Sequence, residues 1–322
     1  MPARQGGPDR QGGVVVRPDG VAVAWEALGD VAHPVVLLVH GFASSREGNW
    51  LRARWAEPLL EAGFRVVTAD LRGHGESGRP RALAAYGLAR FRGDLVAVLD
   101  AAGTGGHELP GEGEGEGAGT GTGTGTDTGT VTGTGTGTVT DTNTGSGTDP
   151  VHVIGYSLGA RLAWDLALRH PQRVRSLVLG GAPVTGSFAG FDHAAALSAL
   201  AESDDQADAA PADAVTARYL RMARGVPGND PHALVRVAEA MRRHGFDPAA
   251  RVPRQPMLFV VGADDDLAPA VRQTAASIPH ADFVELPGRD HLSAVTSRVF
   301  KQAAVGFLQR AGEAHAASAP PG

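Results

Sequence analysis

A serine held between two glycines is the first feature of this sequence that could carry chemistry. The motif is Gly155-x-Ser157-x-Gly159; it follows a short β-branched run at 151–154 and leads into a helical pattern over 158–169. On so sharp a turn from strand to helix, the hydroxyl stands clear of the sheet and the helix N-terminus favours negative charge that develops beside it. The glycines let the strand and the helix pass closely. The pattern predicts a nucleophile elbow with Ser157 at its apex.

A carboxylate and an imidazole follow two later strand patterns. Because the chain contains 45 glycines, a Gly-x-Ser-x-Gly motif can arise by chance and is weak evidence for a nucleophile by itself. The carboxylate and the imidazole are the further evidence that it needs. Three adjacent aspartates, Asp264 to Asp266, come after the apolar run 257–261, and His291 comes after the run 283–286. The carboxyl ends of parallel strands meet at one edge of a sheet. We therefore expect a hydroxyl, a carboxylate and an imidazole on one face, as nucleophilic catalysis requires.

The elements that must position these groups are indicated by apolar runs that alternate with helical patterns. The tetrapeptide 17–20, Arg-Pro-Asp-Gly, separates two apolar runs and predicts a hairpin. Strands alternating with helices predict an α/β fold with a mostly parallel sheet. Runs too short for helices predict buried strands at 34–39, 64–69, 174–179, 256–261 and 283–286. Helical patterns cover about 50–60, 88–102 and 293–309.

One long stretch and both ends of the chain lack such patterns. Residues 103–150 consist mainly of Gly-Glu and Thr-Gly repeats with almost no apolar side chains. This stretch cannot bury enough surface to offset the entropy cost of ordering, so we expect a disordered insertion. Residues 1–13 and 312–322 are expected to be disordered tails.

A second interruption, residues 183–251, contains patterns for three short helices. They begin near Asp192, Pro211 and Asp230, where the last start combines an N-cap with a first-turn proline. Helices inserted after the sixth strand predict a cap over the catalytic face, and a purely structural bundle at the sheet edge is the alternative. The core is then assigned to residues 14–102, 151–182 and 252–311.

Composition narrows the class of protein. Hydrophobic residues make up 42% and charged residues 20% of the chain, which suits a globular protein. The net charge of −6 argues against a nucleic-acid surface, and no apolar run approaches the ~20 residues of a membrane span. Without a visible signal peptide or any cysteine, a cytoplasmic protein is expected. No spacing suits a metal and no phosphate-binding loop follows a strand, so we expect no metal and no cofactor.

Taken together, the motifs resemble those of the α/β-hydrolase superfamily, over about residues 14–311. The order Ser, Asp, His is that of the catalytic triad in this fold. Five motifs in the right order are far more specific than the elbow alone. In chain order they are His40-Gly41-Phe42, Asp70-x-x-Gly73-His74-Gly75-x-Ser77, Gly155-Tyr156-Ser157-Leu158-Gly159, Gly262-x-x-Asp265-x-x-x-Pro269 and Gly288-x-x-His291.

This resemblance implies a role for each matching residue. Ser157 is the expected nucleophile and His291 the general base. The family's Gly-x-x-Asp spacing selects Asp265 from the three aspartates to orient the imidazole. The groups expected to form the oxyanion hole are the backbone N–H groups of Phe42 and Leu158, with His40 and Gly41 supporting the loop.

The inferred function is hydrolysis of a small carboxylic ester through an acyl-enzyme. A serine nucleophile, where the haloalkane dehalogenase and epoxide hydrolase branches have aspartate, argues against both of those activities. C–C bond hydrolysis and perhydrolysis of the serine haloperoxidase kind use the same triad and remain alternatives, as does a non-catalytic ligand-binding module. The expected partner is a small ester-like substrate with an uncharged acyl chain, and the sequence specifies no oligomeric state. The expected apolar pocket wall consists of Phe42, Tyr156, Phe188, Phe191 and Leu292.

Overall fold

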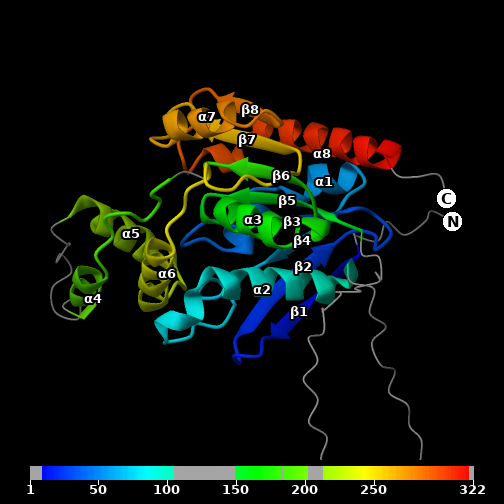
Figure 1. Ribbon diagram of the computed structural model, residues 1–322. Coiled ribbons are helices and arrows are strands. Elements are labelled where there is room, and N and C mark those ends of the chain that lie inside the picture. Colours follow the sequence, from blue (N-terminus) through cyan, green and yellow to red (C-terminus); the bar gives the residue numbers. More distant parts are fainter. Residues whose placement is uncertain (1–8, 105–148, 183–184, 202–212, 319–322) are drawn as a thin grey trace, which may run out of the picture.

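The computed structural model describes residues 9–104, 149–182, 185–201 and 213–318, which are organised around an eight-stranded sheet (Figure 1). The strand order is β1-β2-β4-β3-β5-β6-β7-β8. β2 runs antiparallel to both β1 and β4, and the other neighbouring pairs are parallel, which confirms the expected α/β fold with a mostly parallel sheet. The strands are β1 (Arg10–Val16), β2 (Ala22–Leu28), β3 (Val35–Val39), β4 (Arg65–Ala69), β5 (Val151–Tyr156), β6 (Val174–Gly180), β7 (Met257–Gly262) and β8 (Ala281–Leu286).

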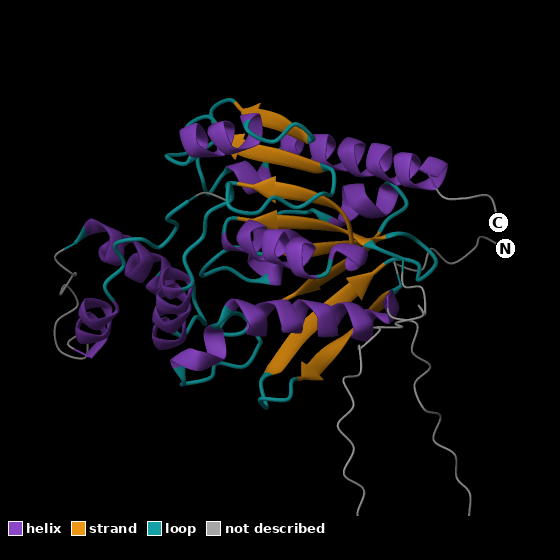
Figure 2. Cartoon of the chain, in the orientation of Figure 1, coloured by secondary structure: helices purple, strands orange, loops and turns teal. Residues whose placement is uncertain are grey.

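Helices cover both faces of the sheet (Figure 2). Side chains of β3 alternate between two apolar clusters: Leu37 and Val39 face α2, α3 and α7, whereas Val36 and Leu38 face α1 and α8. Because both faces are covered, the central strands are apolar throughout, which is why they stand out in the sequence as unbroken runs. The core helices are α1 (Ala56–Glu61), α2 (Leu88–Leu99), α3 (Leu158–Arg169), α7 (Ala268–Ala276) and α8 (Arg298–Ser318).

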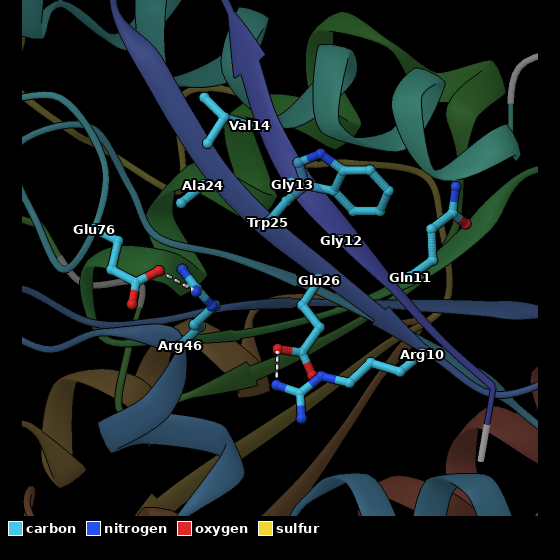
Figure 3. Close-up of a pocket in the computed structure, with 10 residues that line it drawn as sticks. All are labelled: Arg10, Gln11, Gly12, Gly13, Val14, Ala24, Trp25, Glu26, Arg46 and Glu76. Atoms are coloured by element: carbon cyan, nitrogen blue, oxygen red, sulfur yellow. Dashed lines mark hydrogen bonds and ion pairs between the residues drawn. The ribbon is translucent and has the colours of Figure 1, made fainter. Parts of the chain in front are cut away.

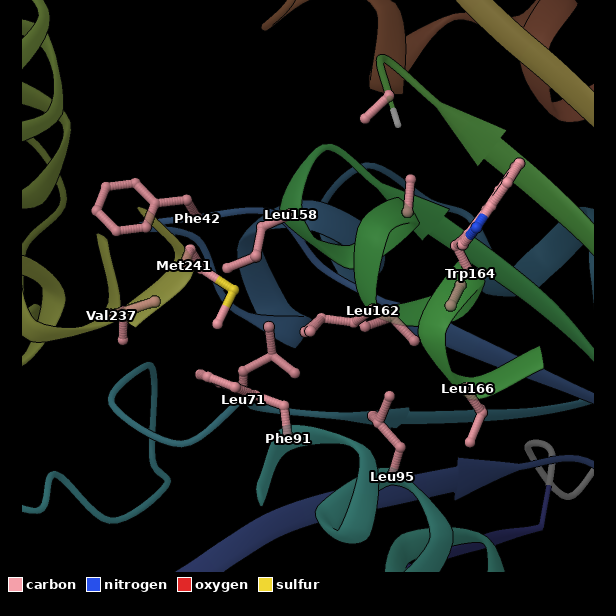
Figure 4. Packing of buried hydrophobic residues seen from close by; sticks show 14 of the residues in the cluster. Phe42, Leu71, Phe91, Leu95, Leu158, Leu162, Trp164, Leu166, Val237 and Met241 are labelled. Carbon is pink, nitrogen blue, oxygen red and sulfur yellow. The ribbon is translucent and has the colours of Figure 1, made fainter. Parts of the chain in front are cut away.

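Three helices between β6 and β7 lie beyond the carboxyl ends of the parallel strands, whose arrowheads point toward them in Figure 2. α6 begins at the predicted N-cap, where the Asp230 carboxylate accepts hydrogen bonds from the N–H groups of His232 and Ala233. Its Val237 and Met241 are buried in the same apolar cluster as α2 and α3, so α6 is packed onto the core (Figure 4). The three helices are α4 (His193–Ala201), α5 (Ala214–Arg224) and α6 (Pro231–Arg243).

Both ends of the core extend beyond the expected boundaries. Residues 10–13, expected to be part of a disordered tail, form the first half of β1, and residues 312–318, expected to be the other tail, continue α8. The pairing of Gly12 with Glu26 is so close that a Cβ on Gly12 would lie 2.8 Å from the carbonyl oxygen of Trp25. Main-chain pairing of this kind needs no apolar side chain, so a search for apolar runs misses it. The alanine-rich end of α8 has high helix propensity.

The helical patterns also differ from the observed helices in detail. The pattern over 50–60 corresponds to a wide helical turn at 47–51 and to the short α1, separated by Arg54 with φ = 57°. The indole of Trp55 donates to the carbonyl oxygen of Val295 at 2.7 Å, so the spacing of the tryptophans in this pattern reflects tertiary packing.

The sequence analysis predicted no helix where the structure has α7. The expected disordered insertion lies outside the described residues over 105–148; Gly103 and Thr104 belong to the turn after α2.

A buried ion pair fastens the loop after β4 to α2. Arg72 and Asp94 are each 1% exposed, and Nε and Nη2 of the guanidinium donate to the two carboxylate oxygens at 2.6 and 2.7 Å. The remaining nitrogen of Arg72 donates to the carbonyl oxygen of Ala85 at 2.6 Å and to Asp19 at 2.9 Å. Burial raises the pKa of the Asp94 carboxyl, against the effect of the guanidinium beside it. Removing one partner would therefore leave the other charge buried without its bidentate counterpart.

We expect Asp94→Ala to lower the free energy of unfolding by about 3–5 kcal/mol, because Arg72 would lose its bidentate partner inside the core. Asp100→Ala is the matched control, because the half-exposed Asp100 carboxylate pairs with Arg173 at 2.8 Å. Loss of this exposed pair should lower the free energy of unfolding by about 1 kcal/mol or less. Urea titrations followed by circular dichroism measure both values. Equal effects of the two substitutions would show that the buried pair does not fasten this loop.

Candidate active site

Ser157 lies on the turn between β5 and α3, as the sequence motif predicts. Its backbone has φ = 54° and ψ = −115°, a conformation that residues other than glycine rarely adopt. The sheet holds the residue there, since the N–H of Ser157 donates to the carbonyl oxygen of Gly180 in β6 at 2.8 Å. A strained residue fixed in this way at the apex of a strand-to-helix turn has the geometry of a nucleophile elbow.

The two glycines of the motif are required by close backbone contacts. A Cβ on Gly159 would lie 2.0 Å from the carbonyl oxygen of Val39 in β3. A Cβ on Gly155 would lie 2.4 Å from the carbonyl oxygen of Gly159 itself. Neither distance is possible between real atoms, so only hydrogen atoms fit where α3 crosses β3 and β5.

Asp265 and His291 complete a hydrogen-bonded chain with Ser157. The His291 Nε2 lies 3.0 Å from the Ser157 Oγ, and its Nδ1 lies 2.7 Å from the Asp265 Oδ2. The other oxygen of Asp265 accepts from the N–H of Leu267 at 2.9 Å. Asp265 is buried, whereas its neighbours Asp264 and Asp266 are exposed. The structure thus brings together the three residues predicted from sequence, and among the three aspartates only Asp265 reaches the imidazole.

The loop that carries His291 is fixed by its own hydrogen bonds. The Tyr156 hydroxyl donates to the main-chain oxygen of His291 at 2.6 Å. The Asp290 carboxylate accepts from the N–H groups of Leu292 and Ser293 at 3.1 and 2.7 Å. These contacts hold the imidazole over the elbow while leaving about a quarter of its side chain exposed, at 26%.

Two backbone N–H groups can form the expected oxyanion hole. Leu158 opens α3, so its N–H has no partner within the helix. Phe42 follows β3, and its N–H has no hydrogen-bond acceptor among the described residues. Two asparagines that the sequence did not single out hold this loop: the Asn49 Oδ1 accepts from the N–H of Gly41 at 3.2 Å, and the Asn229 Nδ2 donates to the carbonyl oxygen of Ala43 at 3.0 Å. An isolated asparagine carries no pattern by which sequence could have found it.

Two buried histidines lie behind this loop and are neutral. Burial lowers the pKa of His40 to about 4 and that of His74 to about 3. The Nδ1 of His40 donates to the carbonyl oxygen of Gly41 at 2.8 Å, which leaves Nε2 to accept from the N–H of Leu71 at 3.0 Å. Neutral His40 thus ties the loop to the segment after β4, in the supporting position expected from sequence. The Nδ1 of His74 lies 3.1 Å from the carbonyl oxygen of Arg72.

A cleft of about 490 Å³ opens in front of Ser157, between the loops of the triad and α5. Phe42, Phe188 and Tyr219 form an aromatic wall. Phe188 stacks on Tyr219 with 4.6 Å between ring centroids, and Phe42 meets these two rings edge-on at 5.6 and 5.5 Å. Leu292, with 74% of its surface exposed, lies at the rim. The size and apolar wall suit a small organic substrate.

Two residues expected in the pocket wall do not line the cleft. Tyr156 belongs to the apolar cluster on the face of α1 and α8, because its side chain points to that side of β5. Phe191 packs edge-on against Tyr219 with 5.9 Å between centroids and lies outside the lining. In both cases nearness in sequence to site residues was misleading, because the direction of the side chain decides the contact.

Part of the lining was missed by the sequence analysis. Val215, Tyr219 and Met222 of α5 all line the cleft. Their spacing of four and three residues places them on one face of the helix. That stripe is visible in the sequence and could have been found by testing 214–224 for a helical period.

A second hollow, of about 590 Å³, lies at the antiparallel end of the sheet (Figure 3). Its charged side chains pair with one another, Arg10 with Glu26 at 2.8 Å and Arg46 with Glu76 at 2.6 Å. No triad residue lines it. This hollow is therefore separate from the site around Ser157.

The residues that the structure describes contain neither a metal-binding group nor a membrane-spanning helix. Within them, no three acidic, histidine or cysteine side chains come together in a group that could bind a metal ion. No described helix has both the length and the apolar character that crossing a bilayer demands.

Comparison with known proteins identifies the family of this chain. Residues 36–302 match the Alpha/beta hydrolase family, and the chain belongs to that family.

Several curated relatives are epoxide hydrolases. Epoxide hydrolase A of Mycobacterium tuberculosis is 37% identical over 92 residues, which cover 28% of this chain and 27% of that protein. Epoxide hydrolase B of the same organism is 28% identical over 158 residues, covering 49% of this chain and 31% of that protein. The chain thus spans less than a third of the length of these two relatives.

Solved structures show the same fold over nearly the whole chain. A hydrolase from Pseudomonas aeruginosa PA01 has a TM-score of 0.62 at 24% identity and covers 92% of this chain and 98% of its own. A carboxylesterase of Nitrososphaera gargenis has a TM-score of 0.62 at 19% identity and covers 94% of this chain and 99% of its own. At these identities the likeness concerns the fold alone.

We expect the free energy of unfolding to fall as the pH is lowered from about 6.5 to 4. In the unfolded chain His40 and His74 titrate near about 6.5, whereas in the folded protein they stay neutral down to about 4 and about 3. Within this window the unfolded state binds more protons, so stability rises with pH, by up to about 1.4 kcal/mol per pH unit for each histidine. Urea titrations at a series of pH values measure the slope.

The variant His74→Gln should reduce this slope by the share of one histidine. His232→Gln, at an exposed position of α6, is the control and should keep the wild-type slope. If His74→Gln keeps the full slope, the histidine does not remain neutral in the folded protein.

Proposed function

We propose that the chain is a serine hydrolase that cleaves small carboxylic esters through an acyl-enzyme. The observation that carries this proposal is the hydrogen-bonded chain from Asp265 through His291 to Ser157, with distances of 2.7 and 3.0 Å. Because the Nδ1–H donates to the carboxylate, the Nε2 that faces the serine is the free base. Membership of the Alpha/beta hydrolase family supports hydrolytic chemistry at such a site.

The arrangement accounts for both halves of the reaction. His291 takes the proton of Ser157 as the oxygen attacks the ester carbonyl, and Asp265 stabilises the imidazolium that forms. The N–H groups of Phe42 and Leu158 receive the developing oxyanion. His291 then gives the proton to the leaving alcohol. A water molecule, deprotonated by the same imidazole, attacks the acyl-serine and releases the acid.

The epoxide hydrolases among the relatives raise a second substrate class, which the nucleophile disfavours. A serine oxygen that opened an epoxide would form an ether, and an ether has no carbonyl for water to attack. Attack on an acyl group forms an ester of Ser157, which the same site can hydrolyse. The chemistry of the nucleophile therefore favours acyl substrates, in agreement with the expectation from sequence.

We expect a fluorophosphonate probe to label Ser157, with loss of fluoride, as peptide mass mapping would show. His291→Ala should abolish the labelling because the serine would lose its base, and Ser157→Ala should lower kcat on para-nitrophenyl esters by up to about a million-fold. His232→Ala, at an exposed position of α6, serves as the control. Absence of labelling in the wild type would favour the ligand-binding module instead.

A substrate panel separates the chemistries that share this triad. We expect turnover of short para-nitrophenyl esters to exceed that of a styrene-type epoxide, a β-diketone and a peroxide with acetate. Preference for the diketone would assign C–C bond hydrolysis, and preference for peroxide would assign perhydrolysis. Epoxide turnover that survives in Ser157→Ala would place the epoxide chemistry on another residue.

A further inference from the structure

One buried cation in the cleft has no carboxylate partner. Arg161 lies in α3, four residues after the nucleophile, and lines the same cleft while being only 2% exposed. Its Nη2 donates to the carbonyl oxygen of Gly245 at 2.8 Å, and the guanidinium lies 5.3 Å from the ring centre of Phe246. Its Nε and Nη1 have no hydrogen-bond partner among the described residues.

The contrast with Arg72 shows how unusual this is within the same protein. Arg72 is equally buried but meets the carboxylate of Asp94 in a bidentate pair and has further acceptors. On α3 itself the carboxylate of Asp165, one turn beyond Arg161, is 2.6 Å from the guanidinium of Arg92. Burial lowers the pKa of Arg161 to about 10, which still leaves it charged at pH 7.

An unpaired buried charge lowers the stability of a protein, so its position in the cleft calls for a ligand that compensates it. Because so little water reaches Arg161, its field in the cleft is weakly screened. The step of four positions from Ser157 to Arg161 corresponds to about 6 Å along the helix axis. A negative group a few carbons from the scissile carbonyl would therefore fall within its reach.

The other charged residues of the cleft are distributed unevenly, with arginines on one side and aspartates on the other. Arg218 and Arg221 of α5 line it together with Arg161, whereas Asp264, Asp266 and Asp290 line it from the loops of the triad. An ester with an anion at the end of its acyl chain is drawn to the arginines and repelled by the aspartates. That pattern orients the substrate before any bond is made.

We propose that the cleft accepts esters whose acyl chain ends in a carboxylate, and that Arg161 is the residue that binds this carboxylate. The inference rests on the proposed ester hydrolysis at Ser157 and replaces the uncharged acyl chain expected from sequence by an anionic one. Arg161 recognises the substrate and takes no part in the transfer of protons.

The test compares para-nitrophenyl hemiglutarate with its terminal amide, which has the same shape without the charge. The wild type should prefer the acid by about 10- to 100-fold in kcat/KM, mainly through KM. Arg161→Met should bring this ratio close to one. Arg169→Met, on the exposed side of the same helix, is the matched control and should keep the ratio of the wild type.

Each outcome decides the proposal. A wild type that hydrolyses both esters equally well, or an Arg161→Met variant that keeps the preference, overturns it while ester hydrolysis stands. A second test, which needs no turnover, applies if Arg161→Met fails to fold. It measures the binding of free glutarate by calorimetry, on the wild type and on Arg161→Gln. Binding that Arg161→Gln loses supports the assignment, and no binding to the wild type overturns it. Failure of the proposed function itself would appear separately, as an unlabelled Ser157.

Discussion

Backbone crowding at the turn between β5 and α3 is the constraint on which the site depends. The helix crosses β3 and β5 so closely that Gly155 and Gly159 cannot carry a side chain, and Ser157 between them is held in a left-handed backbone conformation. The sheet hydrogen bond to Gly180 and the burial of β5 on both faces keep the residue there. If Ser157 is the nucleophile, as proposed, this fixed position is what the imidazole and the backbone donors act upon.

The parts of the fold and the site that could be predicted are those that local sequence specifies. Unbroken apolar runs identified the central strands, because helices cover both faces of the sheet. The order and spacing of Ser157, Asp265 and His291 placed them at strand ends, and those ends meet at one edge of a parallel sheet. The N-cap at Asp230 located the start of α6 for the same local reason.

The parts that could not be predicted depend on partners distant in the sequence. The first residues of β1 are ordered by main-chain pairing with β2, which leaves no apolar signal. Tyr156 was misplaced because strand alternation directs its ring toward α8 rather than the cleft. The missing partner of Arg161 is likewise invisible in the sequence, since a helix pattern shows that an arginine is present and not whether a carboxylate faces it.

The stripe of Val215, Tyr219 and Met222 comes from a different part of the chain than the triad. Ser157, His291 and Asp265 follow β5, β8 and β7, whereas the stripe belongs to the insertion between β6 and β7. This part of the apolar cleft wall and the three polar residues are thus encoded in separate segments. Substitutions in α5 can therefore reshape this wall, and with it the range of molecules that fit the cleft, while the residues around Ser157 stay as they are.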